Sequence, residues 1–466
     1  MAGNSRVRLN AGERQLLLVV GDIAAAIVGA GVALILWGQL DFLGPTADFV
    51  RTRAPWFIFL PLLWPIFMVN LYDVHRAGSW RATLRGVFFA AAAAGVAYLI
   101  IFFIQEGSIA RRAILYFLTL TVALTLVWRW IYIRVFTAAT FMRRVIVVGA
   151  GEGGRALLAA SNLLDPKPFE LIGLIDDNPE KQGQEIEGAQ VVGTNGDLLG
   201  LAQGKGVTDI VVAIQGPISG EMFQALLDAQ EKGIDIVQMP LLYEELFGRV
   251  PIQHLESDWI LRSFVDQVRV SRIYALIKRF VDIAGGVFGL LASLLIVPWA
   301  CLAILIETGR PVFIIQARMG QGGKHYNIVK LRTMFKDAEP EGEAIWAMEE
   351  DPRVTRVGRI LRKTFIDELP QFWNVLRGDM SLAGPRPERP ELIAQLQKKI
   401  PFYRARLLVK PGVSGWAQVN YSKGASIEGS AEKLEYDLYY IKHRGVVMDT
   451  WIILRTIGSV FGFRGV

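Results

Sequence analysis

Residues 359–387 read Arg359-Ile-Leu-Arg-Lys-Thr-Phe-Ile-Asp-Glu-Leu-Pro-Gln-Phe-Trp-Asn-Val-Leu-Arg-Gly-Asp-Met-Ser-Leu-Ala-Gly-Pro-Arg-Pro387 and place one adjacent acid pair, Asp367 and Glu368, within a run of cations. Fixed cations at this density favour a multiply charged phosphate ester, and the two carboxylates could hold a divalent metal or attack phosphorus. Prolines on both sides of Arg386 restrict the backbone, so this arginine can be presented at low entropic cost. The cations are Arg359, Arg362, Lys363, Arg377 and Arg386.

The same residues also permit a purely structural interpretation. A helix that ends before Pro370 would bring Lys363 and Asp367 together as an ordinary ion pair four residues apart. Networks of such pairs imitate functional sites, so charge alone leaves both interpretations open.

The whole chain is too apolar for an ordinary soluble protein. Of its 466 residues 52% are hydrophobic, and its mean hydropathy is +0.34. The net charge of +6 suits a membrane protein with basic cytoplasmic faces near anionic lipid. Nucleic-acid binding is disfavoured because zinc-finger spacing and a basic recognition helix are missing. The single cysteine, Cys301, excludes an internal disulfide and a cysteine-based zinc site, and we expect no cleaved signal peptide.

Four apolar segments fill the first third of the chain, and they predict a four-helix transmembrane bundle over residues 1–140. Three of them approach the ~20 residues that a membrane helix needs. The second is shorter and contains Pro61 and Pro65, which predicts a kink. A buried helical bundle is the alternative. Arginines flank the first and last segments, so the positive-inside rule places both ends of the bundle in the cytoplasm. The segments are Leu16–Trp37, Trp56–Leu71, Val87–Ile104 and Ala113–Phe136.

Residues 141–266 change character and predict a small Rossmann-like α/β domain. A strand-like run leads into a glycine-rich turn of the pattern GxGxxG, formed by Gly149, Gly151 and Gly154. Asp176 follows at the end of the next apolar run, where a dinucleotide fingerprint has its ribose-binding acid. Such turns also serve tight strand–helix packing without a ligand, so a bound dinucleotide and a structural turn both stay open. The strand-like runs are Val145–Val148, Leu171–Ile175, Ile210–Ile214 and Ile234–Gln238, with a helical stretch near Glu221–Lys232.

The C-terminal part closely resembles the bacterial sugar transferase family, whose members are monotopic polyprenyl-phosphate phosphoglycosyl transferases. The resemblance begins near Lys278 and continues to the C-terminus through several ordered motifs. It is carried by Asp367–Gln371, Asn374–Leu376, Gly378–Leu382 and Gly384–Pro387, with Lys330–Met334, Asp351–Thr355 and Lys410–Trp416. Larger members of the family have a nucleotide-binding-like domain before the transferase, which implies a regulatory or assembly role for residues 141–266.

The resemblance implies an enzyme that transfers a sugar-1-phosphate from a UDP-sugar to undecaprenyl phosphate and releases UMP. Asp367 would attack the sugar-bearing phosphate to give a covalent aspartyl-phosphosugar, and Glu368 would be a metal or protonation partner, with Mg²⁺ at the pair. Lys330, Arg362 and Arg386 match family positions that bind phosphate. The enzyme would lie in the bacterial inner membrane, face the cytoplasm, and begin an exopolysaccharide, capsule or O-antigen glycan.

Three further residues join the candidate site. Arg332 lies in the basic motif Lys330–Met334, where we expect it to bind substrate phosphate. Asp437 matches another acid of the family, to which the resemblance assigns no definite role. Many members have a Gly-Arg-Asn run where this chain has Asn420–Ser426; Lys423 could replace the charge of that arginine but not its bidentate geometry. This departure resembles members that act on UDP-glucose or a related hexose.

Residues 267–466 form the predicted transferase domain, and an apolar segment, Val281–Ile306, lies near its start. A full membrane crossing would carry the basic site away from cytoplasmic nucleotides and against the positive-inside rule. We therefore predict a re-entrant helix that breaks at Pro298 and returns to the same side, as the family resemblance also implies.

Five other stretches have simpler interpretations. Gln316–Gly323 and Lys330–Met334 look like an extended pair, and Asp337–Glu350 like a solvated helix or loop. Lys398–Lys410 is basic and aromatic, so we expect it near lipid headgroups. Leu434–Lys442 predicts a helix.

Two rival functions stay open. A NAD-linked nucleotide-sugar oxidoreductase or epimerase would use the GxGxxG turn, but residues 143–266 contain no Tyr-x-x-x-Lys run and the C-terminal half would go unexplained. A non-catalytic membrane sensor or scaffold would use the α/β domain alone. The sequence identifies neither the hexose nor the oligomeric state, and it leaves a homodimer open.

Overall fold

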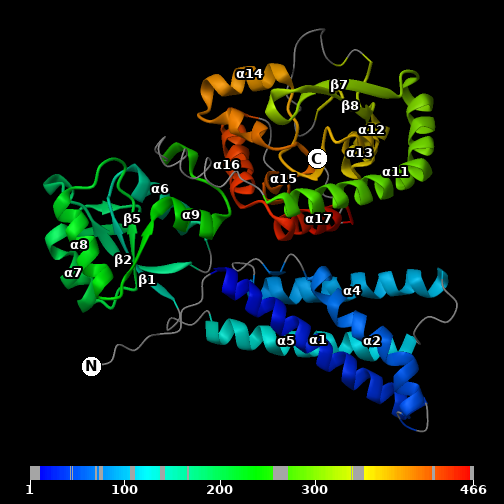
Figure 1. Ribbon diagram of the computed structural model, residues 1–466, viewed down its shortest axis with the longest axis horizontal. Coiled ribbons are helices and arrows are strands. Elements are labelled where there is room, and N and C mark those ends of the chain that lie inside the picture. Colours follow the sequence, from blue (N-terminus) through cyan, green and yellow to red (C-terminus); the bar gives the residue numbers. More distant parts are fainter. Residues whose placement is uncertain are drawn as a thin grey trace. The chain divides into compact units, whose positions relative to one another are not determined.

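The computed structural model describes residues 11–41, 44, 46–68, 71–72, 77–104, 111–136, 142–164, 167–254, 271–336, 338, 351–421 and 426–461. The chain divides into two compact units, Met1–Leu246 and Phe247–Val466. The first contains the N-terminal apolar helices and a six-stranded sheet, and the second contains the acid pair (Figure 1).

Four helices coincide with the four predicted apolar segments. They are α1 (Ala11–Asp41), α2 (Ala47–Phe67), α4 (Trp80–Ile104) and α5 (Arg111–Phe136). By length and composition α1, α4 and α5 can cross a membrane, whereas the apolar part of α2 covers only Phe57–Phe67. The helices are therefore confirmed, and the second remains too short in its apolar part to qualify as a span.

A buried ion pair joins α1 to α5. The Arg129 guanidinium donates to Asp22 Oδ2 at 2.6 Å and to the Leu71 carbonyl at 2.9 Å, and both charged side chains are fully buried. Gly29 lets the helices approach, because a Cβ there would lie 2.6 Å from Thr121 Oγ1. An unpaired charge at this depth would be costly, so the pair favours one alignment of the two helices.

A mixed sheet follows, with the strand order β3-β4-β2-β1-β5-β6. Its strands are β1 (Arg143–Val148), β2 (Phe169–Ile175), β3 (Glu185–Ile186), β4 (Ala189–Gly193), β5 (Asp209–Val212) and β6 (Asp235–Gln238). All neighbouring strands are parallel except β3 and β4. The four predicted strands are confirmed, and the apolar runs arise because the central strands are buried on both faces.

Helices alternate with these strands. They are α6 (Glu152–Asn162), α7 (Asn195–Gly204), α8 (Gly220–Glu231) and α9 (Met239–Phe247). Ser219 caps α8 by accepting the Met222 amide, which explains where the helix predicted near Glu221–Lys232 begins.

The second unit begins before the predicted transferase domain. Val250 and Ile252 are buried in one apolar cluster with Leu434 and Leu438 of the C-terminal part. The structure thus divides the chain at Leu246, whereas the sequence interpretation extended the α/β domain to residue 266. Residues 255–266 lie outside the described part.

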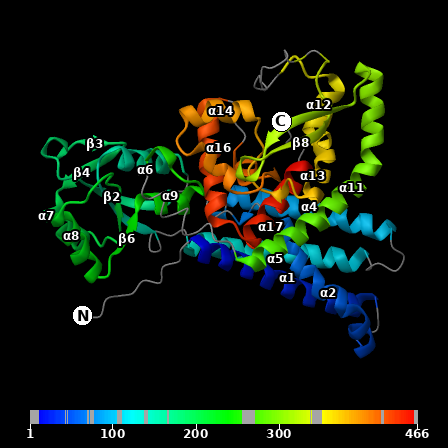
Figure 2. The same cartoon turned by 45° about the horizontal axis from the view of Figure 1, so that its top comes forward.

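A 37-residue helix, α11 (Arg272–Thr308), contains the predicted re-entrant segment and has Pro298 inside it. Figures 1 and 2 both show its ribbon turning partway along into two arms. A proline inside a helix removes one backbone hydrogen bond and commonly causes such a bend. By length and composition α11 can also cross a membrane, so the re-entrant path stays a prediction.

The two arms of α11 pack against the elements that carry the acid pair. Glycines on the first arm allow close approach: a Cβ at Gly289 would overlap the Phe372 ring, and one at Gly286 would lie 2.7 Å from Leu376. The second arm contributes Ala300 and Ile304 to a buried cluster with Leu331 and Leu361. The facing elements are α12 (Arg356–Lys363), the 3-10 helix η6 (Ile366–Gln371) and α13 (Phe372–Arg377).

The rest of the second unit combines short strands with helices. The antiparallel pair β7 (Phe313–Met319) and β8 (His325–Leu331) confirms the predicted extended pair with shifted ends. β9 (Ser381–Ala383) and β10 (Gly412–Ser414) pair in parallel. The remaining helices are α14 (Pro390–Lys399), η7 (Tyr403–Leu408), α15 (Trp416–Asn420), α16 (Ile427–His443) and α17 (Val446–Phe461), and α16 confirms the predicted helix. Nearly all of the acidic stretch 337–350 lies outside the described residues.

Candidate active site

The acid pair lies on η6, just after a break in the chain. α12 ends at Lys363, and Phe365 adopts the left-handed backbone region with φ 57° and ψ 16°, which residues other than glycine rarely do. The continuous helix required for an ordinary pair between Lys363 and Asp367 is therefore interrupted. η6 carries Asp367 and Glu368 in its first turn, with both side chains buried.

Two cations meet on one oxygen of Glu368. Lys330 Nζ of β8 lies 2.7 Å from Glu368 Oε1, and Arg386 Nη2 lies 2.6 Å from the same atom. Burial opposes ionisation, but the charges of Arg386 and Lys330 outweigh it and lower the pKa of Glu368 to about 2. Glu368 is thus a permanent carboxylate at neutral pH that holds both cations in place.

Asp367 lies in a different environment. Burial and the negative charge of Glu368 raise the pKa of Asp367 to about 6, although Lys330, Arg386 and Arg362 limit the rise. Its carboxylate makes no hydrogen bond or ion pair with any residue that the structure describes. It is therefore an ionised group near pH 7 that is surrounded by cations but free to react.

Arg362 and Arg332 have different positions. Arg362 donates through Nε to Thr333 Oγ1 at 2.9 Å, and its charge acts on Asp367. Arg332 is buried, and its Nη2 donates to the carbonyls of Thr308 and Gly309 at 3.0 and 2.7 Å. Arg332 therefore caps the C-terminus of α11, a role that the sequence did not predict. Its Nε and Nη1 have no partner within the described part of the chain.

Residues 383–388, which run from the end of β9 and form the Arg386 loop, are held mainly through their carbonyl oxygens. Pro385 and Pro387 have no N–H, so this loop offers few donors of its own. Four of its carbonyls instead accept hydrogen bonds from other elements, at 2.9 to 3.1 Å. The donors are Lys278 and Tyr440 to Ala383, Gly412 to Pro385, Arg406 to Arg386, and Met319 to Glu388.

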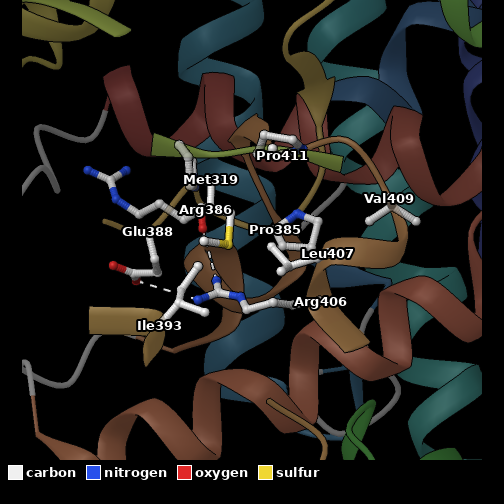
Figure 3. Close-up of a pocket in the computed structure, with 11 residues that line it drawn as sticks. Met319, Pro385, Arg386, Glu388, Ile393, Arg406, Leu407, Val409 and Pro411 are labelled. Atoms are coloured by element: carbon white, nitrogen blue, oxygen red, sulfur yellow. Dashed lines mark hydrogen bonds and ion pairs between the residues drawn. The ribbon is translucent and has the colours of Figure 1, made fainter. Parts of the chain in front are cut away.

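Asp437 forms an ion pair with Arg406, the arginine that donates to the Arg386 carbonyl. Arg406 Nη2 lies 2.9 Å from Asp437 Oδ2 on α16, and both side chains are buried. Figure 3 shows the Arg406 guanidinium beside a small pocket, with dashed lines to Arg386 and Glu388, while the Arg386 side chain extends away. Sequence reasoning placed Arg406 only within the basic stretch Lys398–Lys410 and missed its role, because only the fold reveals its buried partners.

The residues present fit Mg²⁺ only as an ion that arrives with substrate. Within the described residues there is no group of three or more His, Cys, Asp or Glu side chains that could hold a metal. Glu368 Oε1 is already taken by two cations. Asp367 and the other oxygen of Glu368 remain, and Mg²⁺ is commonly held by one or two carboxylates together with substrate phosphates.

In the α/β part, the acid that follows the glycine turn already has hydrogen-bond partners within the same domain. Asp176 Oδ2 accepts the Ala150 amide at 2.8 Å and the Lys181 ammonium at 3.0 Å. Burial opposes its ionisation, but the Asn178 amide and Lys181 lower the pKa of Asp176. A Cβ at Gly154 would overlap the Gly149 carbonyl, so this glycine serves strand–helix packing. The predicted set Gly149, Gly151, Gly154 and Asp176 does come together, with its acid already engaged. Lys423 lies outside the described residues.

Two family models match the chain. The bacterial sugar transferase model covers residues 273–463 and contains the acid pair, its cations and the Arg386 loop. A model described as a CoA-binding domain covers residues 68–240, which include α4, α5 and all six strands of the sheet.

Three relatives illustrate the similarity. The UDP-N-acetylgalactosamine-undecaprenyl-phosphate N-acetylgalactosaminephosphotransferase of Aeromonas hydrophila is 41% identical over 251 residues, covering 53% of this chain and 58% of that one. The undecaprenyl-phosphate glucose phosphotransferase of Komagataeibacter xylinus is 31% identical over 353 residues, covering 73% and 64%. The UDP-glucose:undecaprenyl-phosphate glucose-1-phosphate transferase of Caulobacter vibrioides is 42% identical over 187 residues, covering 39% and 69%. The chain thus spans less than two thirds of the length of the first two relatives.

Proposed function

Because the chain belongs to the bacterial sugar transferase family, we propose that it transfers a sugar-1-phosphate from a UDP-sugar to undecaprenyl phosphate. The observation that carries this proposal is the unpaired carboxylate of Asp367 beside three cations. The names of the three relatives all specify undecaprenyl phosphate as acceptor. The products would be undecaprenyl-diphosphate-sugar and UMP, the first step of exopolysaccharide, capsule or O-antigen synthesis.

The transfer proceeds in two displacements. The Asp367 carboxylate attacks the sugar-bearing phosphorus, the bond from that phosphorus to the bridging oxygen breaks, and UMP leaves with that oxygen. Undecaprenyl phosphate then attacks the phosphosugar-aspartate and frees the carboxylate. Lys330, Arg362 and Arg386 stabilise the charge that develops on the phosphates. When Mg²⁺ is bound with the diphosphate, it supplies further neutralisation of this charge.

Glu368 has a separate duty in this scheme. Since its pKa is about 2, it does not deliver a proton near pH 7. It orders Lys330 and Arg386 by binding both, so that their charges face the phosphate before the donor arrives. In this scheme Glu368 therefore acts as an anchor for the two cations and as a partial metal ligand, and not as a proton donor.

We also infer how the protein sits in the inner membrane. Phe288, Leu295 and Trp299 of α11 are 75%, 75% and 73% exposed, which fits contact with lipid on both sides of Pro298. In our proposal α11 enters from the cytoplasmic side and returns to it, which keeps the acid pair where nucleotide sugars are made. α1, α4 and α5 add apolar helices that anchor the chain.

The α/β part has a supporting role in this proposal. A doubly wound, Rossmann-like sheet is the class that we propose for it, and the parallel strand order β4-β2-β1-β5-β6 supports this assignment. The engagement of Asp176 with Ala150 and Lys181 favours a structural turn over a bound dinucleotide. A regulatory or assembly function explains this part better than redox chemistry.

The test is UMP release from a panel of UDP-sugars by the full-length protein in detergent, with and without undecaprenyl phosphate. We expect acceptor-dependent turnover with one or a few hexose donors. Without acceptor, one equivalent of UMP should appear, and the protein mass should rise by one hexose phosphate on Asp367. Turnover without the burst or the adduct would sink the two-step route, and no UMP from any donor would favour the rival oxidoreductase or scaffold.

A further inference from the structure

We propose that Arg406 is a positioning residue that fixes the backbone of Arg386, and that Asp437 acts on the reaction through Arg406. The inference rests on the proposed function, because Arg386 matters there as a phosphate-binding cation. It gives Asp437 a definite role and adds Arg406 to the machinery.

The side chain of Arg386 is not fixed by packing. It is 44% exposed and ends on Glu368 Oε1 at 2.6 Å. A long, half-exposed side chain has many rotamers, so its reach depends on where its backbone begins. The position of the Arg386 main chain therefore decides whether the guanidinium can meet Glu368 and the substrate phosphate together.

Arg406 supplies the donor that this main chain needs. Its Nη2 donates to the Arg386 carbonyl and to Asp437 Oδ2, each at 2.9 Å. Its Nη1 donates to the Tyr403 hydroxyl at 2.6 Å. The planar fork of a guanidinium can serve these three acceptors at once, whereas a lysine ammonium cannot match their directions.

Asp437 makes the buried cation tolerable. The Arg406 and Asp437 side chains are 7% and 2% exposed, and an unpaired charge at this depth would be strongly destabilising. Buried ion pairs add little net stability compared with apolar side chains of similar size. Apolar side chains in place of this pair would lose the hydrogen bond from Arg406 to the Arg386 carbonyl.

The experiment is a double-mutant cycle on the full-length protein in detergent, assayed by UMP release with undecaprenyl phosphate. Arg406→Lys should lower kcat/KM for the UDP-sugar by about 10–100-fold, the usual effect of displacing a reacting group from its support. In an Arg386→Ala background the same change should cost almost nothing further, because the group it positions is gone. Equal losses in both backgrounds would overturn the inference, since they would mean that Arg406 acts independently of Arg386.

Arg144→Lys is the matched control. Arg144 of β1 also forms an ion pair with a glutamate, Glu170 of β2 at 3.0 Å, but it belongs to the first compact unit. This variant should retain wild-type kcat/KM. If Arg406→Lys fails to fold, Arg406→Met combined with Asp437→Leu removes the buried pair together, and it should fold with the same loss of kcat/KM. A folded double variant with wild-type kcat/KM would refute the proposal.

A second measurement needs no substrate. Hydrogen exchange of the peptide that contains residues 384–388 should become faster in Arg406→Lys and stay unchanged in Arg144→Lys. Faster exchange in a protein that releases no UMP from any donor would leave the positioning contact standing while the proposed function fails. An active wild-type protein whose Arg406→Lys variant shows unchanged exchange and kcat/KM would contradict the inference alone.

Discussion

Asp367 and Glu368 are adjacent in the chain, yet their surroundings drive their pKa values in opposite directions. Glu368 contacts Lys330 and Arg386, which lower its pKa to about 2. Asp367 has no such contact, and burial beside another carboxylate raises its pKa to about 6. Acids whose pKa values are pushed apart serve different chemical roles. The pair therefore separates a group that reacts from one that orders the cations.

Replacing Asp367 by asparagine should abolish transfer while the protein stays folded. The amide cannot form the acyl-phosphate, so UMP release should fall by about three orders of magnitude or more. A raised pKa means that the folded state binds the Asp367 proton more tightly than the unfolded state does. Ionisation of Asp367 therefore costs stability as pH rises from about 4 to 6, and Asp367→Asn should not lower the melting temperature at pH 7.5.

Glu391→Gln serves as the matched control for that substitution. Glu391 is an exposed acid in the first turn of α14, away from the acid pair. It should keep full activity and melting temperature. Substantial transfer by Asp367→Asn would return Asp367 to the role of general base or metal ligand.

The pH dependence of the first half-reaction should report on Asp367. UMP formation without acceptor should decline as pH falls through about 6, because the attacking carboxylate becomes protonated. Glu368→Gln should lower the overall rate but move this decline to lower pH, since the neighbouring negative charge is removed. A single-turnover pH profile of each protein measures both effects.

Asp437 provides the control for the assignment of this pH dependence. Burial raises the pKa of Asp437 to about 6 as well, so it could produce a similar decline. The decline should persist in Asp437→Asn if Asp367 is responsible. Its disappearance in that variant would assign the titration to Asp437 instead.

At the scale of elements, the sequence predicted those strands and helices whose apolar spacing can be read within a single segment. The strands β1, β2, β5 and β6 and the helix α16 were foreseen because their apolar spacing is set within each segment. The family resemblance also identified Lys330, Arg362 and Arg386 as phosphate-binding cations, and the charges of all three act on Asp367 in the structure.

Other features of the site could not be predicted because they depend on residues far apart in the sequence. Arg332 caps α11 through Thr308, 24 residues away, and Arg406 meets Asp437, 31 residues away. The left-handed Phe365 that ends α12 has no glycine to signal it. Asp176 matched a ribose-binding acid in spacing, but only the fold shows it bound to Ala150.

The path of α11 through the membrane can be tested by single-cysteine labelling in a Cys301→Ser background. Ser271 precedes α11 and Lys324 lies between β7 and β8, and both are exposed. A re-entrant helix should leave cysteines at these two positions accessible from the cytoplasmic side only. Thr46, between α1 and α2, should label from the opposite side and is the control. Labelling of Ser271→Cys and Lys324→Cys from different sides would establish a full crossing.

At the scale of the whole molecule, the segment Phe247–His254 belongs with the transferase part although it precedes the family match at residue 273. Trp416 Nε1 donates to the Gly248 carbonyl at 2.7 Å, and the Val250 amide donates to the Glu435 carbonyl at 3.1 Å. Val250 and Ile252 are 0% and 4% exposed within the core of this unit. This segment therefore completes the packing around α16, the helix that carries Asp437.

The minimal active fragment should accordingly begin near Phe247 and not at Ser271. Loss of Val250 and Ile252 exposes the apolar surface that they cover, at a cost of about 3–6 kcal/mol at 1.5–3 kcal/mol per side chain. In detergent, Phe247–Val466 should retain UMP release, whereas Ser271–Val466 should melt at lower temperature and lose activity. Val250→Ala with Ile252→Ala in the full chain should reproduce part of this loss of stability, and Gln253→Ala is the control. Equal stability and activity of the two fragments would show that the segment only connects the units. Because α16 bears the partner of Arg406, loosening this packing should reduce kcat/KM before it unfolds the fragment.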